Sequence, residues 1–68
     1  MNKQILDKLR SETDIWCDEN FPDHPLYDAK WEEKFAELIV QECANYIIEY
    51  YPHSRYEAMF MKKHFGVE

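Results

Sequence analysis

Apolar residues recur at helical spacing along the whole chain, and the first segment carries an ordinary amphipathic pattern. Its apolar positions lie three or four residues apart, at Ile5, Leu6, Leu9, Thr13 and Trp16. Asn2 is a residue type favoured at helix N-caps. We therefore expect a first helix that starts after Asn2 and runs to about Asp18.

The second segment has a wider apolar surface than a packed surface helix needs. It is expected to form a helix from about Ala29 to Tyr50 or Tyr51, with Asp28 as its cap. One face comprises Trp31, Phe35, Leu38, Ile39, Cys43, Tyr46 and Tyr50, and the other comprises Ala36, Val40, Ala44, Ile47, Ile48 and Tyr51. Together the faces exceed the roughly 100° stripe that suffices for packing. The pattern predicts two covering helices, an interface with another chain, or both.

Two proline-containing breaks separate the helical segments. Pro22 and Pro25 end the first helix, and Leu26 and Tyr27 are expected to anchor this connector to the core. The second break is at Pro52.

A third helix is expected from Arg55 to about Phe65. Ser54 and Glu57 have the spacing of a capping box, and Gly66 suits the left-handed position after a helix. Its apolar residues again form two faces, Tyr56, Met59 and Phe60 on one and Ala58, Met61 and Phe65 on the other. The chain contains only one glycine, and this scarcity disfavours β-hairpins and flexible linkers, both of which commonly use glycine. The expected fold is all-α, a single three-helix domain over residues 1–68 that consists of a helical hairpin plus an N-terminal helix.

The short chain also favours assembly with a second copy. A core of this size rarely supplies more than roughly 3–5 kcal/mol without a disulfide, a metal or oligomerisation. Cys43 is expected to be a buried, free thiol in mid-helix, and no signal peptide precedes the first charged residues, so a reduced intracellular protein is expected. No apolar stretch approaches the ~20 residues of a membrane span. A homodimer or higher oligomer is therefore expected, with an interface formed by Val40, Ala44, Ile47, Ile48, Tyr51, Met59 and Phe60.

The charge distribution disfavours direct binding to nucleic acid. Fourteen acidic residues against eight Lys and Arg give a net charge of −6, which opposes contacts with phosphates. No basic residue lies between Arg10 and Lys30, whereas Arg55, Lys62 and Lys63 follow later. The favoured interpretation is a solvated acidic turn with cations at a helix C-terminus. The alternative is head-to-tail attraction between subunits.

No catalytic or metal signature is present in the sequence. The potential ligands Cys17, Asp18, Asp23 and His24 match neither zinc nor EF-hand spacing. No nucleophile has a plausible base beside it, and no glycine-rich loop is present to bind phosphate. We expect no enzyme activity, no cofactor and no metal.

Eleven aromatic residues are many for 68 residues. Packing in the core or at an interface is the favoured explanation. The alternative is a small nucleotide, with bases stacked on tyrosines and phosphates paired with cations. The candidate residues for that ligand are Tyr50, His53, Arg55, Tyr56, Lys62 and Lys63.

Two segments resemble short accessory proteins of tailed bacteriophages. Residues 34–44, with the sequence KFAELIVQECA, and the C-terminal KHFGVE of residues 63–68 carry the similarity, in that order, over about a quarter of the chain. The resemblance implies a small phage protein made in the host cytoplasm, and it implies no site residues. Proteins of this class commonly bind or inhibit host factors, including antiviral defence systems.

These observations favour a non-enzymatic phage accessory protein that oligomerises and binds a host protein. One alternative is a sponge that sequesters a nucleotide immune signal. A minor alternative is mimicry of DNA by the acidic segment between Glu12 and Asp28, although six acids are sparse beside the charge density of duplex DNA.

Overall fold

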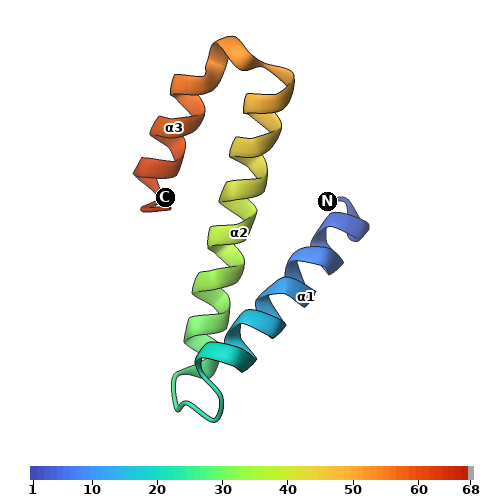
Figure 1. Cartoon of the computed structure of the whole chain (residues 1–68), viewed down its shortest axis with the longest axis vertical. Coiled ribbons are helices and arrows are strands. Elements are labelled where there is room, and N and C mark those ends of the chain that lie inside the picture. Colours follow the sequence, from blue (N-terminus) through green and yellow to red (C-terminus); the bar gives the residue numbers. More distant parts are fainter. Residues whose placement is uncertain (68) are drawn as a thin grey trace. The chain divides into compact units, whose positions relative to one another are not determined.

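The structure is a computed structural model that describes residues 1–67, and these residues form helices and short connections (Figure 1). Helix α1 spans Lys3–Asn20, α2 spans Tyr27–Tyr50, a short 3-10 helix η1 spans Pro52–Ser54, and α3 spans Arg55–His64. The described residues contain no strand. The predicted all-α fold with three helices is confirmed.

The chain divides into two compact units that share α2. The first unit is Met1–Leu38, and contains α1 with the N-terminal part of α2. The second begins at Ile39 and contains the rest of α2, η1 and α3. We call them the N-terminal and the C-terminal unit.

Helix α1 begins at the predicted cap. The side-chain oxygen of Asn2 accepts hydrogen bonds from the backbone N–H groups of Gln4 and Ile5, at 2.9 and 3.2 Å. The helix ends two residues later than expected, where the Phe21 N–H donates to the Cys17 carbonyl at 2.8 Å. Both ends therefore satisfy backbone groups that would otherwise lack an intrahelical partner.

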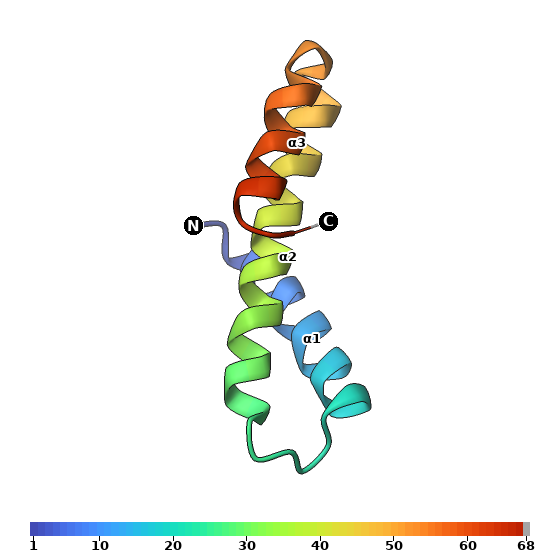
Figure 2. The same ribbon diagram turned by 90° about the vertical axis from the view of Figure 1, so that its left-hand side faces the viewer.

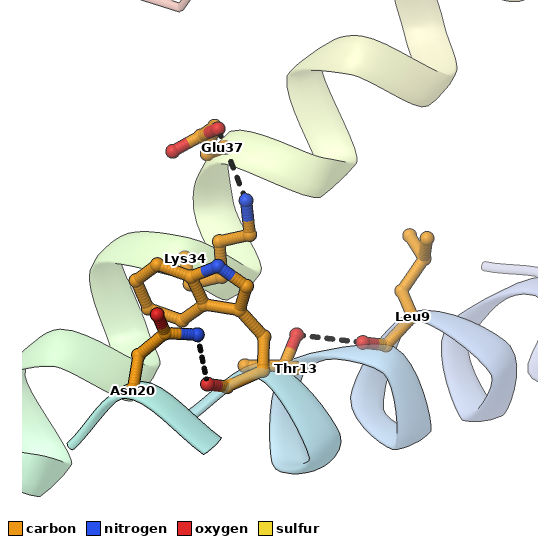
Figure 3. A network of polar contacts seen from close by, with 6 residues as sticks. Leu9, Thr13, Asn20, Lys34 and Glu37 are labelled. Atoms are coloured by element: carbon orange, nitrogen blue, oxygen red, sulfur yellow. Dashed lines mark hydrogen bonds and ion pairs between the residues drawn. The ribbon is translucent and has the colours of Figure 1, made fainter. Parts of the chain in front are cut away.

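The buried stripe of α1 differs from the expected one. Leu9, Thr13 and Cys17 are buried, whereas Ile5 is exposed and Trp16 is half-buried. The Thr13 hydroxyl donates to the Leu9 carbonyl at 2.6 Å, so the buried hydroxyl has a partner (Figure 3). A strict four-residue spacing thus defines the packed side of this helix.

Cys17, and not Cys43, is the buried cysteine, which corrects the expectation from the sequence. Ala44 is completely buried on α2, and successive helix residues are rotated by about 100° because 3.6 residues make one turn. The side chain of Cys43 therefore lies away from the packed side. Both thiols are free.

The connector is anchored by Tyr27 and not by Leu26, which is exposed. The Tyr27 hydroxyl donates to the Asp18 carboxylate at 2.6 Å, and the Trp31 indole N–H donates to Asp14 at 2.6 Å. Each bond joins α1 to α2 within the N-terminal unit. The predicted anchoring role of Leu26 is wrong because the turn before α2 directs this residue to solvent.

Helix α2 begins two residues before the expected start. The Lys30 N–H donates to the Leu26 carbonyl at 2.9 Å, so Asp28 lies within the first turn and does not cap the helix. The turn containing Pro25 leads directly into the helix and leaves no extended residue at position 28. Asp28 still carries negative charge near the positive end of the helix dipole.

Two lysines of α2 cover aromatic rings in the N-terminal unit. The Lys34 ammonium lies 4.8 Å from the centre of the Trp16 ring and 3.3 Å from the Glu37 carboxylate (Figure 3). Lys30 lies 5.5 Å from the centre of the Phe21 ring. The lysine side chains thus extend over aromatic surface, and their ammonium groups pair with Glu37 and Glu33 of the same helix.

In the C-terminal unit, α3 runs antiparallel to residues 39–50 of α2; it lies beside them in Figure 1 and in front of them in Figure 2. Ala44 on α2 and Ala58 on α3 are both completely buried. Both helices of this unit therefore carry a small side chain at a completely buried position.

The turn between α2 and α3 is a 3-10 helix, and it excludes the predicted capping box. The Ser54 N–H donates to the Tyr51 carbonyl at 2.8 Å, and the Ser54 side chain makes no cap hydrogen bond. Ser54 has φ −101° and ψ 20°, whereas a capping residue usually has extended backbone geometry. The prediction of a capping box at Ser54 and Glu57 is therefore wrong.

The C-terminal end of α3 closes in a Schellman motif. Gly66 has φ 73°, which confirms the predicted left-handed position. Its N–H donates to the Lys63 carbonyl at 3.1 Å, and the Val67 N–H donates to the Lys62 carbonyl at 2.8 Å. This pair of bonds defines the motif, and it returns Val67 to a buried position.

Among the described residues, no helix has the length and apolar character required to cross a membrane.

Candidate functional site

An exposed apolar face on α3 is the first candidate for a functional surface. Tyr56, Met59 and Phe60 are 70%, 54% and 67% exposed. Their spacing of three and four residues places them on one side of the helix, while Ala58 is buried on another side. We call these three residues the α3 face.

A hollow of about 390 Å³ lies next to this face. It is lined by Met59, Phe60, Lys62, Lys63 and Val67. The Schellman motif creates the hollow's inner wall, since it holds Val67 beside the last turn of α3. The hollow thus combines apolar side chains with two cations, and among residues 1–67 no acidic residue lines it.

Three tyrosines form a second exposed group at the end of α2. The Tyr46 ring centre lies 4.7 Å from that of Tyr50 and 6.4 Å from that of Tyr51. At least half of each side chain is exposed. The Tyr51 N–H donates to the Ile47 carbonyl at 2.7 Å, which holds this residue next to the helix end. We call these three residues the tyrosine cluster.

The residues predicted for an oligomer interface have different accessibilities. Tyr51, Met59 and Phe60 are exposed. Val40, Ile47 and Ile48 are half-buried, and Ala44 has no exposed surface. The expectation that Ala44 is open to another chain is therefore corrected, because this residue is completely buried within its own chain. The interface itself stays a prediction.

The residues predicted for a nucleotide do not all line one hollow. Lys62 and Lys63 line the hollow described above, and Tyr50, His53, Arg55 and Tyr56 are not among its lining residues. Tyr56 and Lys63 are seven residues apart, which is about 10 Å along a helix axis. The six residues thus divide between the turn at η1 and the far end of α3.

The acidic connector has structural partners. Asp18 accepts the Tyr27 hydroxyl, and Nδ1 of His24 accepts the Leu26 N–H at 3.0 Å. Cys17 is completely buried, and Asp23 has a positive φ of 56°. Within residues 1–67, no three His, Cys, Asp or Glu side chains are grouped as metal ligands. These contacts give the candidate metal ligands roles in shaping the turn.

The sequence contained a signal for the hollow that the periodicity did not reveal. Once Gly66 is assigned to the position after the helix, the Schellman motif predicts contact between Val67 and Lys62. That contact bends the last residues back over α3 and produces a concave surface. The sequence analysis assigned Gly66 to this position and drew no consequence for Val67.

No family model matches this chain, and neither a curated protein nor a solved structure matches it.

Proposed function

We propose that this protein is a non-enzymatic accessory protein that self-associates and acts by binding another protein. The exposure of large apolar side chains in the C-terminal unit is the observation that carries the proposal. Tyr46, Tyr50, Tyr51, Tyr56, Met59, Phe60 and Phe65 are all at least half exposed. Extended apolar surface on a monomer is typical of an interaction site.

The α3 face and the hollow are suited to self-association. Burying a Phe or Met side chain contributes about 1.5–3 kcal/mol, and a chain with a small core gains most from such burial. Phe60 and Met59 belong both to the exposed face and to the hollow. A second chain that covered them would therefore complete the core of the unit.

The tyrosine cluster is suited to a different protein partner. Tyrosine provides a large contact area with few rotatable bonds, and it is enriched at interface hot spots. The Tyr46 and Tyr50 rings already contact each other at a tilt of 43°, so little side-chain freedom is lost on binding. The resemblance of residues 34–44 and 63–68 to phage accessory proteins supports a host protein as this partner, encountered in the host cytoplasm and including antiviral defence factors.

The nucleotide sponge has weaker support, because only two of its six candidate residues line the hollow. Mimicry of DNA is also less favoured. Asp14 and Asp18 accept hydrogen bonds from Trp31 and Tyr27, so part of the acidic segment holds α1 against α2.

Capture from bacterial host lysate tests the proposed partner binding. The tagged wild-type chain is compared with Tyr46→Ser/Tyr50→Ser and with a matched control, Lys3→Ser/Glu32→Ser, which alters two exposed polar residues. We expect the wild type and the control to retain the same host protein and the tyrosine variant to lose it. Circular dichroism checks that all three chains are folded. Retention by all three chains alike, or by none, would contradict the proposal.

A further inference from the structure

The hollow on α3 has a charge pattern that specifies its occupant. Its apolar surface is provided by Met59, Phe60 and Val67, and its cations are Lys62 and Lys63. Within the described residues neither lysine forms an ion pair. A matching occupant presents an apolar side chain between two carboxylates, because opposite charges across an interface fix its orientation.

The outer face of α1 has that pattern. Ile15 is 56% exposed, and it lies between the exposed residues Glu12, three positions earlier, and Glu19, four positions later. Residues at these spacings lie along one side of a helix. Neither glutamate forms an ion pair within residues 1–67. Lys8, one turn before Glu12, is the nearest cation along this side.

This face of α1 lies on the side opposite to the helix's packed residues. Ile15 is two residues from both Thr13 and Cys17, a rotation of about 200° on a helix of 3.6 residues per turn. Thr13 and Cys17 are completely buried. The face is therefore open to another molecule while α1 keeps its own packing.

We propose that the hollow of one copy receives the Glu12, Ile15 and Glu19 face of a second copy. Ile15 inserts among Met59, Phe60 and Val67, and the two carboxylates approach the two lysine ammonium groups. The inference rests on the proposed self-association and names the two surfaces that meet. Apolar burial provides affinity, and the charges provide orientation.

The two surfaces are different, so this contact is head-to-tail. Each copy offers one hollow and one α1 face, and association continues beyond two copies unless a ring closes. We expect the average mass to rise with protein concentration. We also expect it to fall with added salt, because exposed charge pairs are screened within about 10 Å at 0.1 M.

Two charge-reversed variants test the pairing of the surfaces. Glu12→Lys/Glu19→Lys leaves the hollow basic, and Lys62→Glu/Lys63→Glu leaves the α1 face acidic. We expect each variant alone to dissociate, with an apparent Kd raised by about tenfold or more, since repulsion between like charges replaces attraction. Mixed in equal amounts, the two variants should associate again, because each surface then meets one of opposite charge. Sedimentation velocity measures both results.

Two control variants reverse the same number of charges at positions outside the hollow and the α1 face. Glu32→Lys/Glu49→Lys and Lys3→Glu/Arg55→Glu alter exposed residues outside both surfaces, and both should associate as the wild type does. Lys62 is half-buried, so Lys63→Glu alone is the second variant if the double change unfolds the chain, with thermal melts as the check.

The possible results distinguish a failure of the proposed self-association from a failure of the pairing between the hollow and the α1 face. A wild type that is monomeric at every concentration overturns the self-association and this inference with it. A wild type that associates while Glu12→Lys/Glu19→Lys associates equally well overturns only the inference. Only the inference is likewise overturned if the two charge-reversed variants stay dissociated when they are mixed. If Lys62→Glu/Lys63→Glu loses a captured host protein and keeps its own association, the hollow binds an acidic host partner instead.

Discussion

The two cysteines have different environments and therefore different reactivities. Cys17 has no exposed surface, and its burial, with the charges of Asp18 and Asp14 beside it, raises the pKa of the thiol against the opposing effect of Lys34. Cys43 is exposed. Because the thiolate is the reactive form, both accessibility and pKa disfavour reaction at Cys17.

A thiol-reactive chromogenic reagent at pH 8 should therefore modify the exposed Cys43 quickly. We expect Cys17 to react at least about tenfold more slowly, since its thiol is both buried and protonated. Cys43→Ser should remove the fast phase, and Cys17→Ala, as the control, should leave it intact. Equal rates at the two thiols would contradict the described packing of α1.

Tyr27 should give the chain a distinct alkaline transition. Its hydrogen bond to Asp18, then its partial burial and the nearby negative charges, raise the pKa of Tyr27 to about 12 from the ordinary value of 10.0. A raised pKa means that the folded chain favours the neutral phenol. Its contribution to stability is present below pH 10 and is lost as the pH rises through about 12.

Absorbance at 295 nm during an alkaline titration measures this ionisation. The wild type should show a component near pH 12, and Tyr27→Phe should lack it. In Asp18→Asn the pKa of Tyr27 should move back toward its ordinary value, because the acceptor is no longer charged. Circular dichroism at each pH establishes whether the helices persist. If the component lost in Tyr27→Phe lies near the ordinary pH of 10.0 instead of near 12, the bond to Asp18 does not form.

Local residue chemistry predicted the helix ends at Asn2 and Gly66 correctly, and it failed for the caps at Asp28 and Ser54. Asn2 and Gly66 act through backbone groups within a few residues, so both roles follow from the sequence. The bond between Trp31 and Asp14 joins residues 17 positions apart, and it depends on how α1 meets α2. Cys43 was assigned wrongly because both sides of its helix are apolar, which leaves periodicity unable to select the buried side.

Helices α2 and α3 each carry a completely buried alanine in the C-terminal unit. Ala44 and Ala58 are completely buried. A larger side chain at either site has no free volume to occupy, and overpacking forces side chains from their rotamers or shifts the backbone. The antiparallel pairing of residues 39–50 with α3 (Figure 2) is therefore sensitive to side-chain size at these positions.

Ala58→Leu should lower the free energy of unfolding by about 1–3 kcal/mol. Ala36→Leu makes the same chemical change at an exposed position of α2, and it should stay within about 0.5 kcal/mol of the wild type. Urea unfolding followed at 222 nm measures both values, with Ala58→Val as a milder variant if the leucine chain is unfolded. A similar loss for both leucine variants would argue against close packing at Ala58.

Element types were predictable from the sequence, whereas the details of the connections were not. The first helix ends two residues later, and the second begins two residues earlier, than the pattern indicated. The capping box failed because η1 gives Ser54 a backbone geometry that its spacing to Glu57 does not reveal. Proline positions thus located both breaks without specifying their hydrogen bonds.

For the chain as a whole, the unequal distribution of exposed apolar side chains is the property most relevant to function. The C-terminal unit carries the α3 face, the hollow and the tyrosine cluster. The sequence predicted an excess of apolar surface and assigned it mainly to α2. In the C-terminal unit the structure locates the exposed part on α3 and at the end of α2, whereas Ala44 is completely buried. The hollow was not predictable from periodicity, since it depends on the fold of the last residues over α3.

The central claim is that this unit associates with a second copy through Met59 and Phe60. Sedimentation equilibrium over a range of micromolar concentrations tests it most directly, on the wild type and on Phe60→Asp. We predict that the wild type exceeds the monomer mass of 8.3 kDa and returns toward it on dilution, while Phe60→Asp stays monomeric because a carboxylate cannot be buried without a partner. A wild type that sediments as 8.3 kDa at every concentration would contradict the claim.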